Sequence, residues 1–159
     1  MFTIILLIMA AASAAVTILV KKQKKGTEVL ETVIACMLIF NVGVGCIFAF
    51  AGHVFAPDLI ATRIGWPAGS PFQLEVAAAN LAIGTLGFLS LRFHRDFRLA
   101  AAIAFALFLF GSALVHIREI FCRGDHAAYN TGPVLLAGDI LIPLVLLVLV
   151  IIQRKSTPS

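Results

Sequence analysis

The sequence predicts an all-α integral membrane protein, a bundle of five transmembrane helices that forms a single domain over residues 1–159. Composition is the first observation behind this prediction, since 61% of the residues are hydrophobic and only 13% are charged. The second is a mean hydropathy of +1.05. The third is that the apolar residues form long runs bounded by basic residues. One soluble core of this length could not bury so much apolar surface, so a bilayer is the solvent that suits the chain.

Five apolar runs are long enough to cross a bilayer. A crossing helix needs about 20 mostly apolar residues, because the hydrocarbon core is about 30 Å thick and each residue rises about 1.5 Å. The runs that qualify are residues 2–20, 32–53, 73–91, 99–117 and 134–152. The last four form the expected core, and the first is an additional N-terminal span. A cleaved signal peptide is disfavoured, because its basic residues would precede the apolar run rather than follow it.

The basic residues predict the orientation of the chain. Most of them fall in the segments after the first, third and fifth spans, namely Lys21, Lys22, Lys24, Lys25, Arg92, Arg95, Arg98, Arg154 and Lys155. The positive-inside rule places these segments in the cytoplasm, so the amino terminus is expected outside and the carboxyl terminus inside the plasma membrane. Because these residues mark the ends of apolar runs, the net charge of +4 does not indicate nucleic-acid binding. The expected partner is the lipid bilayer.

Five ionisable side chains are expected near the outer ends of four different spans. They are His53, Glu75, His116, Glu119 and Asp139. Ionisable groups within a span are costly and usually face the bundle interior or an aqueous cavity. We therefore expect a polar pocket of histidines and carboxylates at the outer leaflet, which binds a small ligand or a metal for a membrane redox partner.

Four of these residues form a candidate metal site, His53, Glu75, His116 and Glu119. Mixed imidazole and carboxylate ligands on facing helices suit a first-row transition metal. His116 and Glu119 are three residues apart and share a helix face, but their order is the reverse of that in the di-iron bundle motif. A haem ligated by His53 and His116, or a quinone, is the alternative cofactor. A purely structural role is also consistent, with Arg118 pairing to Glu119 or Asp139.

Small and polar residues recur along the second and third spans. In the second span Asn41, Gly45, Ala49 and His53 are spaced by four residues, and the third span carries Asn80, Gly84 and Gly87. Such faces favour close helix approach and interhelical hydrogen bonds. We expect these two spans to pack together, with His53 meeting Glu75 at the outer end.

The two expected outer loops are rich in turn residues, which favours compact, shaped segments over long helices. They cover residues 56–72 and 122–133, and they contain the only tryptophan, Trp66, and the only tyrosine, Tyr129. Aromatic rings with a polar group are favourable at the headgroup level, so both are expected to be membrane anchors.

Two other classes of function are consistent with the same residues. A transporter or channel of 159 residues would require a homo-oligomer. The scarcity of polar residues expected at mid-membrane, only Asn41 and Asn80, argues against this class. An accessory subunit would use its small-residue faces to scaffold a larger complex. The sequence identifies no catalytic residue and favours a role other than an enzyme.

Three segments carry a family resemblance: IGWPAGSPFQLEVAAANLAIGTLG from Ile64 to Gly87, the later GSALVHIREI, and the segment from Gly132 to Asp139. They resemble a family of small bacterial and archaeal membrane proteins of unknown function and, more distantly, the DoxX-like four-helix membrane proteins. The resemblance covers roughly residues 40–150 and includes the candidate site. The closer family implies a prokaryotic plasma membrane but no activity, whereas the DoxX-like group implies association with membrane redox enzymes and quinone chemistry.

Overall fold

The computed structural model describes residues 2–156 and is helical throughout its regular structure. Its elements are α1 (Phe2–Val20), α2 (Gly26–Met37), the π-helix η1 (Leu38–Val44), α3 (Gly45–Phe55), α4 (Pro57–Ile64), α5 (Phe72–Leu89), α6 (Asp96–Arg123), the π-helix η2 (Val134–Leu141) and α7 (Ile142–Ser156). Within the described residues, five helices are long and apolar enough to cross a membrane. This confirms the predicted all-α bundle with five membrane-compatible helices.

Two of the five helices contain a π-helical segment, in which the backbone hydrogen bonds span five residues instead of four. α2, η1 and α3 form one continuous helix, Gly26–Phe55, and η2 continues into α7 as Val134–Ser156. At the end of η1 the amide of Gly45 bonds to the carbonyl of Phe40, five residues back. A π-turn rotates the side chains that follow it relative to those before it, and such turns are frequent at functional sites.

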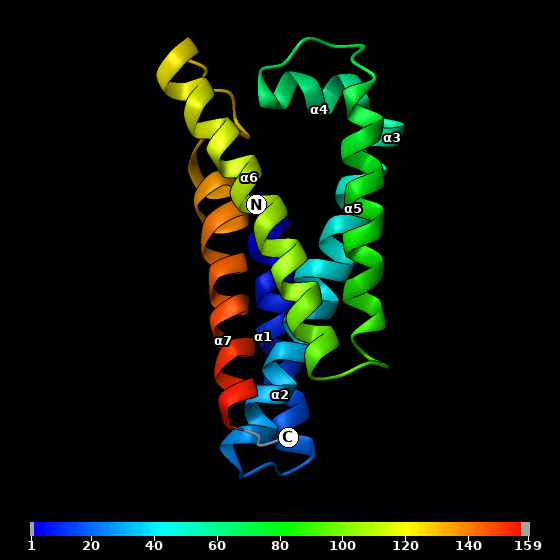
Figure 1. Ribbon diagram of the computed structural model, residues 1–159, viewed down its shortest axis with the longest axis vertical. Coiled ribbons are helices and arrows are strands. Elements are labelled where there is room, and N and C mark those ends of the chain that lie inside the picture. The colour runs from blue at the N-terminus through cyan, green and yellow to red at the C-terminus, as the bar shows by residue number, and fades with distance from the viewer. Residues whose placement is uncertain (1, 157–159) are drawn as a thin grey trace.

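The helices differ in length, so some of them extend beyond the hydrocarbon core and others do not. At about 1.5 Å per residue, the 19 residues of α1 match the hydrocarbon core of about 30 Å. The continuous helix Gly26–Phe55 has 30 residues and α6 has 28, so both are longer than the core. α1 begins partway along the bundle (Figure 1), where Phe2 stacks on Phe48 of α3 with ring centroids 4.0 Å apart.

Close helix packing holds together the end of the bundle opposite α4. α2 packs against α1 and α7 at this end. α5 packs along η1 here and along α3 toward the α4 end, as the sequence predicted for the second and third spans. At Gly87 the backbones of α5 and η1 approach so closely that a Cβ atom there would lie 2.5 Å from the amide nitrogen of Gly43. Buried apolar side chains of α1, α2, η1, α6 and α7 form the core beside this crossing.

Side-chain bonds of Arg98 reinforce the same end. Arg98 opens α6 and is only 3% exposed, yet its Nε donates to the carbonyl of Ser90, 3.1 Å away, and its Nη1 lies 3.3 Å from the carboxylate of Glu31. His94 contacts the same carboxylate at 3.1 Å. The short connection between α5 and α6 is thus tied to α2.

At the other end of the bundle a short helix lies across the helix ends (Figure 1). This helix, α4, has eight residues and lies in the segment where the sequence predicted only a compact loop. Its limits follow local rules: Pro57 occupies the first turn, where a missing amide proton costs nothing, and Gly65 ends the helix in a left-handed conformation, φ 85°. The helix pair α3–α5 and the pair α6–η2 are separate beneath α4 in Figure 1.

Candidate functional site

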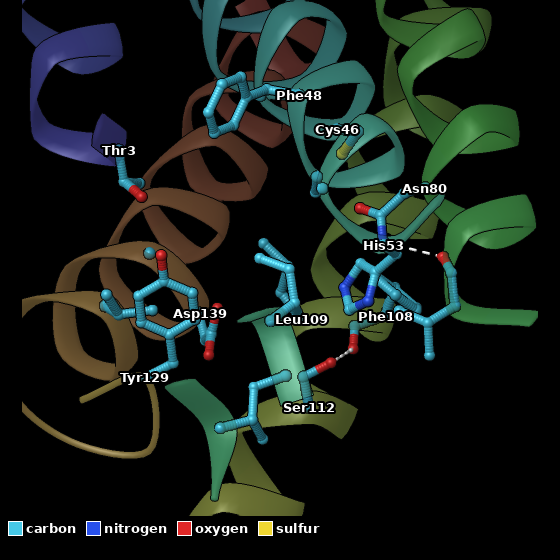
Figure 2. Close-up of a pocket in the computed structure, with 18 of the residues that line it drawn as sticks. Thr3, Cys46, Phe48, His53, Asn80, Phe108, Leu109, Ser112, Tyr129 and Asp139 are labelled. Carbon is cyan, nitrogen blue, oxygen red and sulfur yellow. Dashed lines mark hydrogen bonds between the residues drawn. The ribbon is translucent and has the colours of Figure 1, made fainter. Parts of the chain in front are cut away.

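A cavity of about 630 Å³ occupies the space between these two helix pairs. Its walls come from α3 and α5 on one side and α6 and η2 on the other, the first turns of α1 contribute to its lining, and α4 with Trp66 covers it. Its volume falls within the range of small-molecule sites. Most of the lining is apolar, and a small number of polar side chains project into it (Figure 2).

Aromatic rings form a large part of this lining. They are Phe2, Phe48, Trp66, Phe72, Phe105, Phe108 and Tyr129. Trp66 lies beside Phe72 with ring centroids 6.0 Å apart. Trp66 and Tyr129, expected from the sequence to be membrane anchors, therefore contribute to the cavity instead of only marking the headgroup level.

Asn41 supplies an amide to the cavity from the π-helix η1. Its side chain is 5% exposed, and neither its amide oxygen nor its amide nitrogen has a hydrogen-bond partner within residues 2–156. Asn80 of α5 also lines the cavity, but its Nδ2 donates to the carbonyl of Val76 at 2.9 Å. A buried amide without a partner costs free energy, so a ligand that offers both a donor and an acceptor would stabilise Asn41 if a local movement of the wall exposed its amide.

Asp139 and His116 face one another on the opposite wall. Asp139 comes from the π-helix η2 and His116 from α6, and both are 9% exposed. Their Oδ2 and Nε2 atoms are 3.8 Å apart, which allows an electrostatic contact but is too long for a hydrogen bond. The other side of the His116 ring lies near Asn130. The Asp139 carboxylate therefore has no hydrogen-bond donor among the described residues.

His53 lies across the cavity from Asp139 (Figure 2), and its partner differs from the one that the sequence predicted. Its Nδ1 is hydrogen-bonded to Oε1 of Gln73, which is 3% exposed in the first turn of α5. Glu75, the expected partner, is exposed. Two residues along a helix correspond to about 200°, so Gln73 and Glu75 cannot both face α3.

Glu119 is held in a separate cluster near the end of α6. Its Oε1 lies 3.5 Å from Nη1 of Arg118, and its Oε2 lies 3.0 Å from Nη1 of Arg123. Glu119 and Glu75 do not line the cavity, whereas His53, His116 and Asp139 do. The five candidate residues thus share one end of the bundle without forming one site.

The candidate metal ligands are not arranged as a metal site. Among residues 2–156, no group of three or more His, Cys, Asp or Glu side chains converges closely enough to hold a metal ion. The physical reason is helix register, because Glu75 points outward and Glu119 is bound by two arginines. Of the two histidines predicted as alternative haem ligands, His53 bonds to Gln73 through Nδ1 and His116 faces Asp139.

The predicted packing face of the second span lies partly on the cavity. Asn41, Gly45, Ala49 and His53 all line it. In the third span, Gly84 contacts Ile47 and Cys46, and Gly87 contacts η1, so these two glycines lie at the helix crossing. Gly43, which lies outside the four-residue pattern, is the glycine of η1 that faces α5.

The cover of the cavity joins the two helix pairs. The amide of Tyr129, in the segment before η2, donates to the carbonyl of Arg63 in α4 at 2.9 Å. Asp125 of the same segment lies against Gly65, where any side chain would collide with its carboxylate. Gly65 is therefore required both for its positive φ and for this close approach.

Several residues of this cavity are not predicted from the sequence to be site residues. Asn41 and Asn80 were interpreted as packing or mid-membrane residues, and Trp66 and Tyr129 as anchors. One signal was available, since the only tryptophan and the only tyrosine both fall in shaped loops at the same end of the bundle. The π-turns that direct Asn41 and Asp139 into the cavity leave no recognisable pattern in the sequence.

Comparison with known proteins gives one result. A model of a family of unknown function, DUF6790, matches residues 1–159, so the match includes the first span as well as the four that follow. Neither the curated proteins nor the solved structures give a match. The chain is therefore a member of this family of unknown function, with helices compatible with a multi-pass membrane protein.

Proposed function

We propose that this protein binds a lipid-soluble small molecule in the cavity beneath α4. The observation that carries the proposal is the unpaired amide of Asn41, buried on a π-turn in the wall of an otherwise mainly apolar cavity. Small-molecule sites combine this kind of apolar lining with a few placed polar groups. A buried amide without a partner lowers the stability of a protein. A ligand that forms hydrogen bonds with the amide would compensate this cost.

The position of the cavity in the bilayer supports a lipid-soluble ligand. α1 is about as long as the hydrocarbon core is thick, and its first residues, Phe2 and Thr3, line the cavity. The cavity then extends from the boundary between hydrocarbon and headgroups toward the middle of the membrane, where Asn41 and Asn80 line it. Gly111 and Leu107 of α6 line it and are also exposed, which supports a lateral route between helices for a molecule dissolved in the membrane.

A photolabelling experiment tests the proposal. The probe is trifluoromethyl phenyl diazirine, a small uncharged molecule that partitions into bilayers, applied to the protein in phosphatidylcholine liposomes and mapped by peptide mass spectrometry. We expect label on cavity residues such as Gly52 and Ser112 as well as on the lipid-facing Leu114. Labelling confined to lipid-facing residues would contradict a cavity open to lipid-soluble molecules.

A matched pair of variants on α6 sharpens this experiment. Gly111→Phe should fill the cavity, because a Cβ at Gly111 meets nothing within 4 Å, and it should remove the label from Gly52. Leu114→Phe adds a ring three residues away on the exposed face of the same helix, where Leu114 is 68% exposed. That variant should keep the cavity label. Equal labelling of Gly52 in both variants would show that the probe reaches it by another route.

For orientation, we propose that the α4 end faces outward and both the α5–α6 connection and the carboxyl terminus face the cytoplasm. The basic residues of the positive-inside pattern lie at the end opposite α4, which supports this arrangement. Cys122 is exposed at the α4 end, while Cys36 and Cys46 are buried. A membrane-impermeant maleimide should therefore label Cys122 in intact cells, and labelling only after cell lysis would reverse the orientation. The prokaryotic plasma membrane and the distant DoxX-like relationship stay predictions.

A further inference from the structure

The charge of the cavity lining is unbalanced. Among the described residues that line it, Asp139 is the only carboxylate, and no lysine or arginine is present. The arginines of this end do not line the cavity: Arg118 and Arg123 are paired with Glu119, and Arg63 of α4 is exposed. His116 is the nearest basic group, but its Nε2 is 3.8 Å from the carboxylate and donates no hydrogen bond to it. The cavity therefore offers one buried carboxylate that lacks a strong cationic partner.

Aromatic rings surround the same space. Tyr129 lies on the Asp139 side of the cavity (Figure 2), and Phe108, Trp66 and Phe48 are among the other rings that line it. The face of an aromatic ring attracts a cation, most strongly where water is excluded. An anion or a neutral polar molecule gains no comparable attraction from these ring faces. Carboxylate and ring faces thus favour a ligand of the same charge.

We propose that the ligand of this cavity is a lipid-soluble organic cation, with Asp139 as its counter-ion and the aromatic lining as its cage. This inference rests on the proposed function, because it names the class of molecule that the cavity takes. A buried carboxylate is costly in an apolar site, and a bound cation compensates that cost where the protein itself provides no lysine or arginine. The apolar walls cover the hydrophobic part of the ligand.

Two probes of nearly equal size and shape but opposite charge test the inference on the unmodified protein. Tetraphenylphosphonium is a lipid-soluble cation, and tetraphenylborate is its anionic counterpart. Equilibrium binding of each radiolabelled probe is measured with the protein in phosphatidylcholine liposomes, after subtraction of protein-free liposomes. The fluorescence of Trp66, the only tryptophan, serves as a second signal from the cavity itself. We expect saturable binding of the cation and none of the anion at equal free concentration.

Variants of Asp139 identify the counter-ion. Asp139→Asn keeps the shape of the side chain and removes the charge, so the cation should bind roughly tenfold more weakly or worse. Asp139→Glu keeps the charge and should bind within about threefold of the unmodified protein. The matched control is Glu75→Gln, which removes an exposed carboxylate from the same end of the bundle, outside the cavity, and should leave binding unchanged.

Several outcomes would overturn the inference. Equal binding of the two probes would show that the cavity does not select charge. Unchanged affinity in Asp139→Asn would remove Asp139 from the site. An absence of saturable cation binding would also reject an organic cation, and diazirine labelling of Gly52 would then decide separately whether the cavity still accepts uncharged molecules. If Asp139→Asn does not fold, the comparison of the two probes on the unmodified protein still decides the question.

Discussion

The two ends of this bundle use similar small residues to opposite effect. At the end opposite α4, Gly87 of α5 meets the backbone of η1 directly, and no space remains between the helices. At the α4 end, Gly45, Ala49 and Gly52 of α3 line a cavity of about 630 Å³. A glycine in a membrane helix therefore permits close approach without requiring it. Whether helices meet is decided by the register of the facing helix and by side chains that hold the ends apart or together.

Polar groups show the same contrast between the packed end and the cavity. Arg98 is 3% exposed and has partners on two other elements, whereas Asn41 is 5% exposed and its amide has no partner in the described part of the chain. Buried polar groups with complete hydrogen bonds stabilise a structure, and incomplete ones mark sites that await a ligand or bear a cost. The packed end thus provides stability, and the cavity is the place to look for binding.

The largest expected effect breaks the packed end. Gly87→Ala places a Cβ 2.5 Å from the amide nitrogen of Gly43 and 2.8 Å from the carbonyl oxygen of Leu38, and backbone atoms cannot move aside as a side chain can. We expect a loss of about 3 kcal/mol in the free energy of unfolding, because overpacking forces backbone shifts. Thermal unfolding in detergent, followed by circular dichroism, measures it. An unchanged midpoint would show that α5 and η1 can separate freely.

A smaller loss is expected when the Arg98 contacts are removed. Arg98→Ala leaves the carbonyl of Ser90, itself fully buried, without its donor and frees Glu31 from α6. Bonds that involve a charged group contribute about 2 kcal/mol, so the midpoint should fall less than in Gly87→Ala. Arg92→Ala, at an exposed residue of the same connection, is the control and should leave the midpoint in place. Equal effects of the two arginines would assign the loss to charge alone.

The third prediction concerns the cavity, where a substitution is expected to increase stability. Asn41→Leu replaces an unpaired buried amide by an apolar group of similar size, so stability should increase by about 1 kcal/mol. The control is Asn80→Leu, which removes an amide that has a hydrogen bond to Val76 and should bring no such gain. Both are compared by thermal unfolding in the same detergent. A clear loss of stability in Asn41→Leu would mean that a bound molecule already satisfies the amide.

The smallest expected change in stability comes from a glycine that lines the cavity, and it is compared with the change at Gly87. Gly111→Ala lies in the middle of α6, where an added Cβ meets nothing within 4 Å. A helical glycine replaced by alanine should gain about 0.5 kcal/mol, because the unfolded chain loses freedom. The same unfolding assay then shows a small increase for Gly111→Ala and a large decrease for Gly87→Ala. Changes of the same sign would contradict the distinction between an open and a closed helix face.

Register explains why the candidate site could be predicted only in part from the sequence. The end of the bundle that carries His53, His116 and Asp139 follows from counting spans, and the structure places all three on the cavity. The partners of these residues do not follow, because a shift of two positions along α5 exchanges Glu75 for Gln73 beside His53. Glu119 was expected in the pocket and is instead held by Arg118 and Arg123, an alternative that the sequence had left open.

Hydropathy alone determined the class of this protein. Long runs of apolar residues are more stable in a bilayer than in water. A backbone in hydrocarbon must form its hydrogen bonds within the protein, so each of the five apolar runs is expected to be a helix. Only the tertiary structure shows where those helices are in contact and where a cavity separates them. The π-turns η1 and η2 rotate Asn41 and Asp139 toward a common cavity, and α4 covers it. Such rotations depend on contacts between segments far apart in the chain, which no local pattern of residues records.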